Sequence, residues 1–395
     1  ICLNWQIDAL QIAICFPFMS AAINSIAFCI GCLLRRPAQA ATLGLAALLI
    51  GARLLPETTK AIGRRIDLPG AVLGAGALSM LVFAVIEGET RGFGSVVVLV
   101  LFCGAAVAGA GFGWWQRRAT QPLLDPVYLR SPAFAASNLV AFAAYFGTFA
   151  VFFFCALYLH VVVQQSGLRI AAQFVPMAVA MILASLVTGR WLARTGARRP
   201  IVAGCLLFAI GLLLTDQVLS PHQAYLPLAA SLAVAGIGIG VVVVPTTFAA
   251  MNAVPADRAG MASSAVNTSR EIGAVAGTAV LGAIVNSSLI SHLNTQLDKL
   301  GLGTLKGLVI PEVLHGGAAF TTPGSGSAAS QATTPLAKKL LESVYEAFYA
   351  GLHACLVVSA VIVVVAGLVA AVALRHERTA GGVEETGGSP QPAAI

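Results

Sequence analysis

Arg270 and Glu271 are the residues of this sequence whose types and position most suggest chemistry. They are adjacent, opposite in charge, and lie well inside an apolar run from about residue 262 to residue 287. An arginine at the centre of a membrane-spanning helix costs about 2.5–3.5 kcal/mol on insertion scales. Because successive helical residues point about 100° apart, the two side chains cannot simply pair with each other. A charge kept at that cost favours a polar pathway through the membrane.

Neighbouring residues extend this candidate site. Asn267 lies one helical turn before the charged pair, and Gly273 and Gly277 form a small-xxx-small surface beyond it. Small residues at this spacing let two membrane helices approach closely. We therefore expect the polar end of the helix to face a water-filled cavity while the glycine face packs on another helix. The alternative is that Arg270 lies near the interface and extends to lipid head groups.

Asn138 and Tyr145, in an earlier apolar run, are further candidates for a substrate or proton pathway. The alternative for any one intramembrane polar group is a helix–helix hydrogen bond, worth about 0.6 kcal/mol on average. That alternative also covers Gln173, Asn252 and His353. Tyr145 and the run Phe152–Phe154 predict either an aromatic wall for apolar ligands or lipid-facing bulk. Glu271 is the only acidic residue within a span that we single out for proton transfer.

The elements that must position these residues are membrane helices. Only 10% of the 395 residues are charged and 58% are hydrophobic, against about 25% and 45–50% in soluble domains. The apolar residues form uninterrupted runs of the length, about 20 residues, that crosses a bilayer core. This pattern predicts an all-α integral membrane protein. The expected spans are 9–34, 37–52, 68–87, 92–115, 133–159, 170–189, 200–219, 225–250, 262–287 and 346–374.

The basic residues indicate topology rather than nucleic-acid binding, although the net charge is +7. From about residue 53 onward, Lys and Arg gather in alternate loops, which the positive-inside rule places in the cytoplasm. We expect a multi-pass protein of a bacterial plasma membrane with its C-terminus inside. The basic set comprises Arg53, Lys60, Arg64, Arg65, Arg117, Arg118, Arg130, Arg190, Arg194, Arg198, Arg199, Arg258, Arg375 and Arg378.

No pattern in the chain predicts a metal, a cofactor or an enzyme active site. Cys29 and Cys32 form a CxxC, but no histidine or second pair lies nearby to complete a metal site. The glycine runs 109–113 and 236–240 do not lie between a strand and a helix, as a nucleotide loop would. Close helix packing in lipid is the better interpretation of these glycines.

The segment Gly189-Arg-Trp-Leu-Ala-Arg-Thr-Gly-Ala-Arg-Arg199 joins two expected spans. Its plain interpretation is a tight, positive-inside turn. It also resembles the signature cytoplasmic loop of major facilitator transporters, G-x-L-a-D-R-x-G-r-r. The residues that match are Gly189, Arg194, Gly196, Arg198 and Arg199. The resemblance implies close packing of helix ends and a lock made by charge contacts, but Ala193 stands where the family usually has Asp.

Three more stretches resemble the fourteen-helix drug:proton antiporter family of this superfamily. Val254-Pro-Ala-Asp-Arg-Ala-Gly-Met-Ala-Ser and Asn267-Thr-Ser-Arg-Glu-Ile-Gly273 are similar to its loop and penultimate helix. Asp67-Leu-Pro-Gly70 resembles the opening of its extra central helices. Gln121-Pro-Leu-Leu-Asp-Pro-Val-Tyr-Leu-Arg130 resembles its linker before the second bundle. The resemblance runs from about Leu43 to Arg378.

This resemblance implies a major facilitator fold with five parts. A remnant of the N-terminal bundle would occupy 1–52, two extra central transmembrane helices 68–115, and the C-terminal six-helix bundle 133–374. A flexible extracytoplasmic loop is expected at 288–343, where TTPGSGSAAS is typical of such loops, and a disordered cytoplasmic tail at 375–395.

The implied function is proton-coupled export of amphipathic, often cationic, small molecules, as in multidrug efflux and antibiotic resistance. The expected partners are a small-molecule substrate, protons and the lipid bilayer. The start at Ile1, with Arg35 and Arg36 on the unexpected side, favours an N-terminally incomplete chain. Two alternatives stay open: export of a dedicated metabolite such as an antibiotic, lipid or siderophore, and a non-transporting module that needs a partner half.

Overall fold

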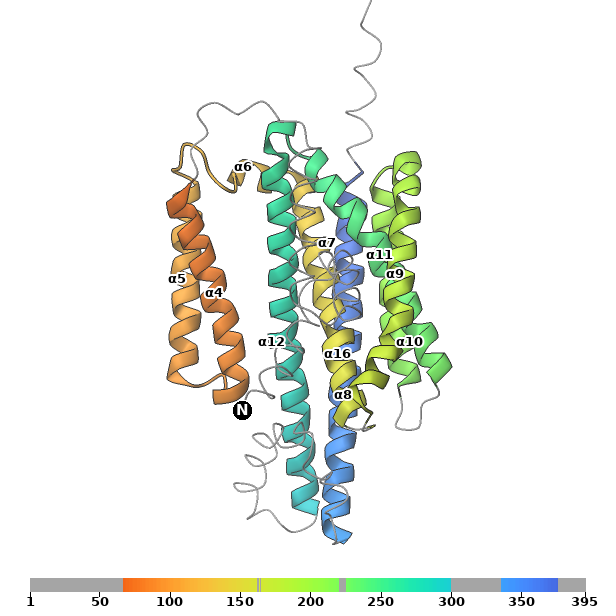
Figure 1. Cartoon of the computed structure of the whole chain (residues 1–395). Coiled ribbons are helices and arrows are strands. Elements are labelled where there is room, and N and C mark those ends of the chain that lie inside the picture. The colour runs from red at the N-terminus through yellow and green to blue at the C-terminus, as the bar shows by residue number, and fades with distance from the viewer. Residues whose placement is uncertain (1–66, 162, 164, 220–224, 300–334, 376–395) are drawn as a thin grey trace, which may run out of the picture. The chain divides into compact units, whose positions relative to one another are not determined.

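The structure, a computed structural model, describes residues 67–161, 163, 165–219, 225–299 and 335–375. Within these ranges every regular element is a helix (Figure 1). Eight of the helical segments are long and apolar enough to cross a membrane, and each coincides with an expected span. The expected spans 9–34 and 37–52, with Arg35 and Arg36, lie outside the described residues.

α4 (Leu68–Arg91) and α5 (Val96–Gln116) form an antiparallel hairpin. Asp67 caps α4 by accepting a hydrogen bond from the Gly70 backbone N–H at 2.9 Å. The same carboxylate accepts one from Trp115 Nε1 at 2.8 Å and one from Gln116 Nε2 at 3.1 Å. Burial alone would raise the pKa of Asp67, but these donors outweigh it and hold the pKa below its ordinary value.

The Asp-Leu-Pro-Gly motif has a structural reason in this hairpin. Proline suits the first turn of a helix, where its missing N–H is not needed. A Cβ on Gly70 would lie 2.2 Å from an Asp67 carboxylate oxygen and 2.5 Å from Gln116 Nε2. Glycine at this position therefore leaves room for the side chains that join the two helices.

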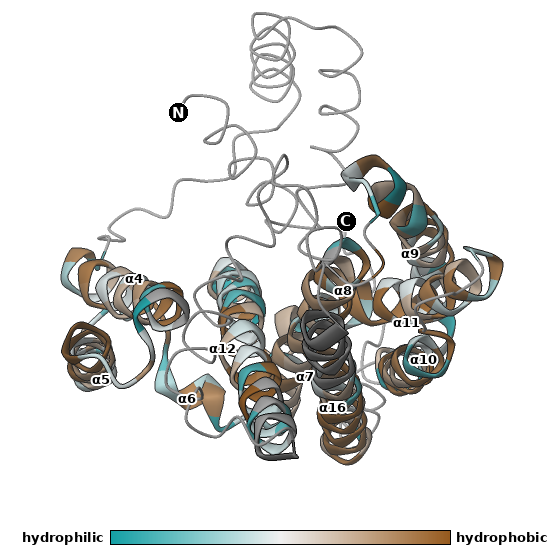
Figure 2. Ribbon diagram, turned by 90° about the horizontal axis from the view of Figure 1, so that it is seen from below, coloured by the Kyte–Doolittle hydropathy of each residue, from teal (hydrophilic) through white to brown (hydrophobic). Residues whose placement is uncertain are grey.

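The remaining long helices form a bundle: α7 (Pro132–Phe149), α9 (Gly167–Thr195), α10 (Arg198–Val218), α11 (Tyr225–Asn252), α12 (Ala259–Lys299) and α16 (Pro335–Ala373). α11 packs against both α9 and α10, α7 against α12, and α16 against α10, α12 and α7. The short α6 (Pro126–Leu129) leads from α5 into α7. α11 lies between α9 and α10 when the bundle is seen end-on (Figure 2).

Glycines on two sides of α11 explain this close packing. A Cβ on Gly236 or Gly240 would come within 2.5 Å of a backbone carbonyl oxygen of α9, that of Met177 or Met181. A Cβ on Gly238 would lie 2.3 Å from the backbone nitrogen of Phe208 on α10. The run 236–240 is therefore a packing motif, as the sequence indicated.

Hydrophobic residues make up much of each long helix, as the brown ribbon in Figure 2 shows, and many of them are exposed. On α9, Val179 is 49% exposed, Leu183 58% and Leu186 69%. Large apolar groups in such numbers on an outer face would be unfavourable in water. The surface fits contact with lipid or with further membrane helices.

Two connections differ from the sequence-based expectations. α9 continues to Thr195 and α10 begins at Arg198, so the segment Gly189–Arg199 is mostly helical. Only Gly196, with φ of +75°, breaks the helix, because glycine adopts this left-handed conformation readily. α12 likewise continues past Ser288 to Lys299, and α16 begins at Pro335. Leu289, Leu293 and Leu297 recur every fourth residue beyond Ser288, a helical spacing hidden by polar neighbours.

A short π-helix, η1 (Ala150–Cys155), interrupts the span that starts with α7 and ends with α8 (Ala156–Val161). The sequence pattern predicted one uninterrupted helix there. π-Helices insert an extra residue into a turn, and apolar periodicity does not reveal a single such insertion. The remaining part of the expected loop, 300–334, and the tail from residue 376 lie outside the described residues.

Candidate functional site

Arg270 forms the centre of a polar cluster between three helices. It is 3% exposed, although it lies within the span of α12. Its guanidinium donates to the Asn267 side-chain oxygen at 3.0 Å and to Thr247 Oγ1 at 2.7 Å. A third hydrogen bond reaches the Val243 carbonyl at 3.3 Å. A planar guanidinium with five N–H donors suits several acceptors in fixed directions.

An aromatic ring completes the cluster from the opposite side. The guanidinium carbon of Arg270 lies 5.6 Å from the centre of the Tyr145 ring on α7, within the range of a cation–π interaction. Thr247 and Val243 belong to α11, just after and just before Pro245. Arg270 thus connects α7, α11 and α12.

Burial separates Arg270 from its neighbours on α12. Asn267 and Glu271 are exposed on the outside of the described bundle, while Arg270 points inward. The structure therefore supports the view that adjacent residues 270 and 271 face different ways. Among the described residues, Arg270 itself is enclosed between α7, α11 and α12. The reason is that α7 and α11 supply enough oxygens and an aromatic face to enclose the guanidinium.

Asn138 joins α7 to α12 at a neighbouring point. Its side-chain oxygen accepts a hydrogen bond from Ser269 Oγ at 2.9 Å, and its Nδ2 donates to the Phe134 carbonyl at 2.8 Å. Farther along α12, a Cβ on Gly273 would lie 2.3 Å from the Phe142 carbonyl oxygen. The glycine face of α12 thus packs on α7, as expected. Asn138 acts here as a helix–helix contact.

The Phe152–Phe154 run packs inside the protein. Phe154 is 3% exposed, and the Phe152 ring stacks on Phe174 of α9 with centroids 5.0 Å apart. Phe153 stacks on Phe149 with centroids 5.1 Å apart. Because η1 shifts the register of the helix, successive aromatic residues can all reach neighbouring side chains. Phe152 and Phe153 are half-buried, so each has one side in these ring contacts and another side open to its surroundings.

The loop residues that resemble the facilitator signature lie at one end of the bundle. Arg198 donates from Nε to the Ala371 carbonyl at 2.8 Å, near the C-terminal end of α16. A cation there satisfies a terminal carbonyl and complements the helix dipole. Gly189, Arg194 and Arg199 are not packed in the same way: a Cβ on Gly189 would meet nothing within 4 Å, and both arginines are exposed.

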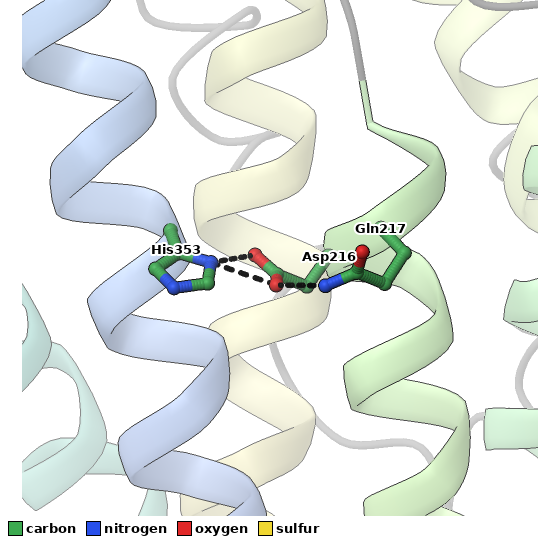
Figure 3. A network of polar contacts seen from close by, with 3 residues as sticks. All are labelled: Asp216, Gln217 and His353. Carbon is green, nitrogen blue, oxygen red and sulfur yellow. Dashed lines mark hydrogen bonds and ion pairs between the residues drawn. The ribbon is translucent and has the colours of Figure 1, made fainter.

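The sequence reasoning missed Asp216, and it named His353 only as a possible helix–helix hydrogen bond, without a partner. Asp216, in the span Arg198–Val218, is 3% exposed and contacts His353 of α16 (Figure 3). Glu271 is therefore not the only acidic residue within a span. The signal was present, because an aspartate within the apolar run 200–219 is as unusual as the charges at 270 and 271. Its position near the end of the run concealed it.

Similarity to a known protein family identifies the family of this chain. A family profile described as Major Facilitator Superfamily matches residues 40–278. The chain belongs to the Major Facilitator Superfamily. Eight membrane-length helices and the absence of strands from the described residues agree with this assignment, and the match begins close to Leu43, where the resemblance was first evident.

Individual superfamily members give a more specific comparison. The chain is 31% identical over 258 residues to "Multidrug resistance protein Stp" of Mycobacterium tuberculosis, covering 65% of this chain and 48% of that protein. It is 28% identical to "Tetracenomycin C resistance and export protein" of Streptomyces glaucescens, covering 83% and 60%. It is 29% identical to "Multidrug efflux pump LfrA" of Mycolicibacterium smegmatis, covering 83% and 63%. The chain thus spans about half to two thirds of the length of these relatives.

Proposed function

We propose that this superfamily chain takes part in the proton-driven export of amphipathic small molecules across a bacterial plasma membrane. The family assignment carries the proposal, together with relatives whose names refer to multidrug resistance and efflux. The finer assignment is to the fourteen-helix drug:proton antiporters. It is supported by the motifs at 67–70, 121–130 and 254–273.

The Arg270 cluster supports a role at the substrate or proton pathway. A buried guanidinium that joins three helices fixes their spacing, and its charge lowers the energy of a negative group nearby. Glu271 and Asn267 lie beside it on the exposed side of α12. In this proposal Arg270 and Tyr145 form the fixed wall of the pathway. Glu271 and Asn267 then provide groups that a cationic ligand or a proton can reach.

The proposed orientation follows from the arginines. Arg194, in the last turn of α9, and Arg198 and Arg199, in the first turn of α10, lie beside the same connection at one end of the bundle. Arg258 lies in the connection before α12 at that end, and Arg117 and Arg118 follow α5. The positive-inside rule puts these connections in the cytoplasm, with the end of α16 on the same side.

A dedicated exporter is the second candidate. It is favoured by the similarity to a protein named for tetracenomycin C resistance and export and to another named "Puromycin resistance protein pur8", from Streptomyces alboniger. Growth assays separate the two candidates. A multidrug exporter would protect cells against several unrelated cationic dyes and antibiotics, whereas a dedicated exporter would protect against one chemical class.

Dye efflux tests the proposal directly. The full chain is expressed in a drug-sensitive bacterium, and efflux of a fluorescent cationic dye is followed with and without a protonophore. We expect efflux that the protonophore abolishes. Glu271→Gln should remove the proton-driven part, and Arg270→Ala should remove efflux altogether. The matched control is Glu87→Gln, since Glu87 pairs with Arg91 at the end of α4, away from the cluster.

Two results would contradict the proposal at different points. Absence of efflux for every dye, with the chain present in the membrane, would exclude drug export by this chain. Normal efflux in both Glu271→Gln and Arg270→Ala, at equal membrane levels, would show that drug export does not use this cluster.

A further inference from the structure

Asp216 and His353 form a titratable pair that the proposed pathway does not use. His353 Nδ1 lies 2.7 Å from each carboxylate oxygen of Asp216, and the Gln217 amide nitrogen lies 3.4 Å from Oδ2. In Figure 3 both carboxylate oxygens turn toward the imidazole across the gap between α10 and α16. The Asp216 side chain is 3% exposed, whereas 52% of the His353 side chain is exposed.

Because Asp216 is buried and His353 is half exposed, the two side chains have different roles in binding a proton. An ionised carboxylate removed from water is strongly destabilised unless it is paired and hydrogen-bonded. Asp216 therefore depends on a donor from His353. The imidazole has one nitrogen turned to the carboxylate and an exposed side. It is the member of the pair that can exchange a proton with its surroundings.

Both residues lie at the same depth. Counting about 1.5 Å per helical residue, Asp216 is about 27 Å along α10 from Arg198, and His353 is about 30 Å along α16 from Ala373. A bilayer core is about 30 Å thick. The pair is thus near the membrane face opposite the arginine-rich connections, a few residues inside the end of the α16 span at Phe348. Water at that face is within reach of an imidazole.

Among the described residues, the titratable groups of the surrounding helices nearest this depth are two cysteines, two tyrosines and His160 of α8, whose Nδ1 lies 3.4 Å from the Gln165 carbonyl oxygen. Cys155 of η1 lies close enough to Asp216 and to Cys355 of α16 for electrostatic interaction. Tyr158 of α8 is fully buried and lies against Tyr349, one turn before His353. Thiols and phenols in apolar surroundings favour their neutral forms.

The other neighbouring helices place their charged groups elsewhere. α7 has no titratable residue except Tyr145, and α11 has none except Tyr225, at its first position. α12 carries Arg270 and Glu271 toward the other face and His292 beyond the pair. α9 carries an exposed Arg169 in its first turn and its remaining arginines near the arginine-rich end.

We propose that Asp216 and His353 form a proton-binding site that opens to the membrane face opposite the signature loop. The Nδ1–H of neutral His353 donates to Asp216, and a proton from water adds at Nε2. The pair then changes from a net charge of −1 to 0, and the imidazolium pairs with the carboxylate and holds α10 to α16. Release returns the same proton to water. The site deepens the proposed proton coupling, and only its use in transport rests on that function.

The site is testable in the full chain without transport. Histidine labelled with ¹⁵N is introduced into protein in lipid nanodiscs, and the His353 signal is assigned by its loss in His353→Gln. Because Asp216 accepts from Nδ1, neutral His353 should be the Nδ1–H tautomer at about pH 9. In Asp216→Asn, which keeps a hydrogen-bond acceptor but removes the charge, proton binding by His353 should weaken about tenfold or more.

A matched histidine provides the control. His292 contacts the Ser288 carbonyl of its own helix and not Asp216. Its NMR signals should therefore be the same in wild type and Asp216→Asn. Unchanged His292 signals would also show that the variant is folded. Asp216→Glu, which keeps the charge, should bind the proton more tightly than Asp216→Asn. An Nε2–H tautomer in the wild type, or equal titration of His353 in wild type and Asp216→Asn, would overturn the proposal. The expected titration without dye efflux would instead refute drug export and leave the proton site standing.

Discussion

Arg270 is held by neutral oxygens and an aromatic face, which lets a cation remain inside the helix bundle. The hydroxyl of Thr247, the amide of Asn267 and the carbonyl of Val243 replace hydration, and Tyr145 covers one side. Each such bond to a charged donor is worth about 1.5–3 kcal/mol in favourable cases. At the scale of single residues, the cluster is therefore also a stabilising contact among three helices.

Replacing Arg270 should lower stability as well as efflux. We expect Arg270→Ala to reduce the free energy of unfolding by about 1–3 kcal/mol, because it removes the donor shared by α11 and α12. Arg270→Lys should lose about 1 kcal/mol, since one ammonium cannot reach all three acceptors. Thermal unfolding in detergent measures both. Arg258→Ala, in the connection before α12, is the control, and an equal loss there would refute a specific role for the cluster.

Asp67 gives a prediction about pH. Its pKa in the folded chain lies below the ordinary value of 3.8. The stabilisation that the Asp67 carboxylate contributes is therefore fully present above pH 3.8. It is lost as the pH falls through the lower pKa of Asp67 in the folded chain. Asp67→Asn should lower the unfolding midpoint at about pH 7, where the wild-type carboxylate accepts three hydrogen bonds. The two proteins should converge as the pH falls from 3.8 through the lower pKa of the folded chain.

The fluorescence of Trp115, a direct partner of Asp67, reports this transition. Asp125→Asn is the matched control, since Asp125 caps only the four-residue α6. A difference between wild type and Asp67→Asn that does not shrink at all as the pH is lowered below 3.8 would show that the carboxylate charge is not what stabilises the hairpin.

The helices themselves could be predicted from apolar run length, because the bilayer demands that length from every spanning segment. Their ends and interruptions could not. The signature segment is helical almost throughout because only Gly196 adopts a helix-breaking conformation, and η1 leaves no mark in the apolar pattern. Pairing between helices was predictable only where glycines imply it, as at Gly273 and Gly238.

A pair of glycine substitutions tests packing at the scale of elements. Gly238→Val should destabilise the bundle by more than about 3 kcal/mol, because even its Cβ would lie 2.3 Å from the Phe208 backbone nitrogen. Gly76→Ala on α4, where a Cβ would meet nothing within 4 Å, should be neutral or stabilising by up to about 1 kcal/mol. Thermal unfolding of the two variants distinguishes them. Similar midpoints would contradict close contact between α10 and α11.

The candidate site was only partly predictable. Arg270, Glu271 and Asn267 stood out because charge within a span is unusual, and they do lie near one another on α12. The acceptors Thr247 and Val243 carry no such signal, since hydroxyls and carbonyls are common in membrane helices. Asp216 and His353 do carry a signal, because each is a polar titratable residue within an apolar run. Their pairing could not be predicted, because they are 137 residues apart in the chain and meet only through the packing of α10 on α16.

At the scale of the whole molecule, we expect the arginine-rich end of the helix bundle to face the cytoplasm. In a cysteine-free background, a cysteine at Gly94, in the exposed turn between α4 and α5, should react with an impermeant thiol reagent added to intact cells. A cysteine at the exposed position Arg199 should react only after permeabilisation. The opposite result would invert the proposed topology, and it would also place the Asp216–His353 pair at the cytoplasmic face.

The glycine contacts of α11 have a mechanical consequence. Because α11 touches both α9 and α10 through backbone atoms, sliding α11 past either helix would first require the two to separate along the glycine contacts. We expect α9, α10 and α11 to move together as one rigid body whenever the protein changes conformation. Bending would then fall to the span that contains η1, where the regular hydrogen-bond ladder of the helix is already interrupted.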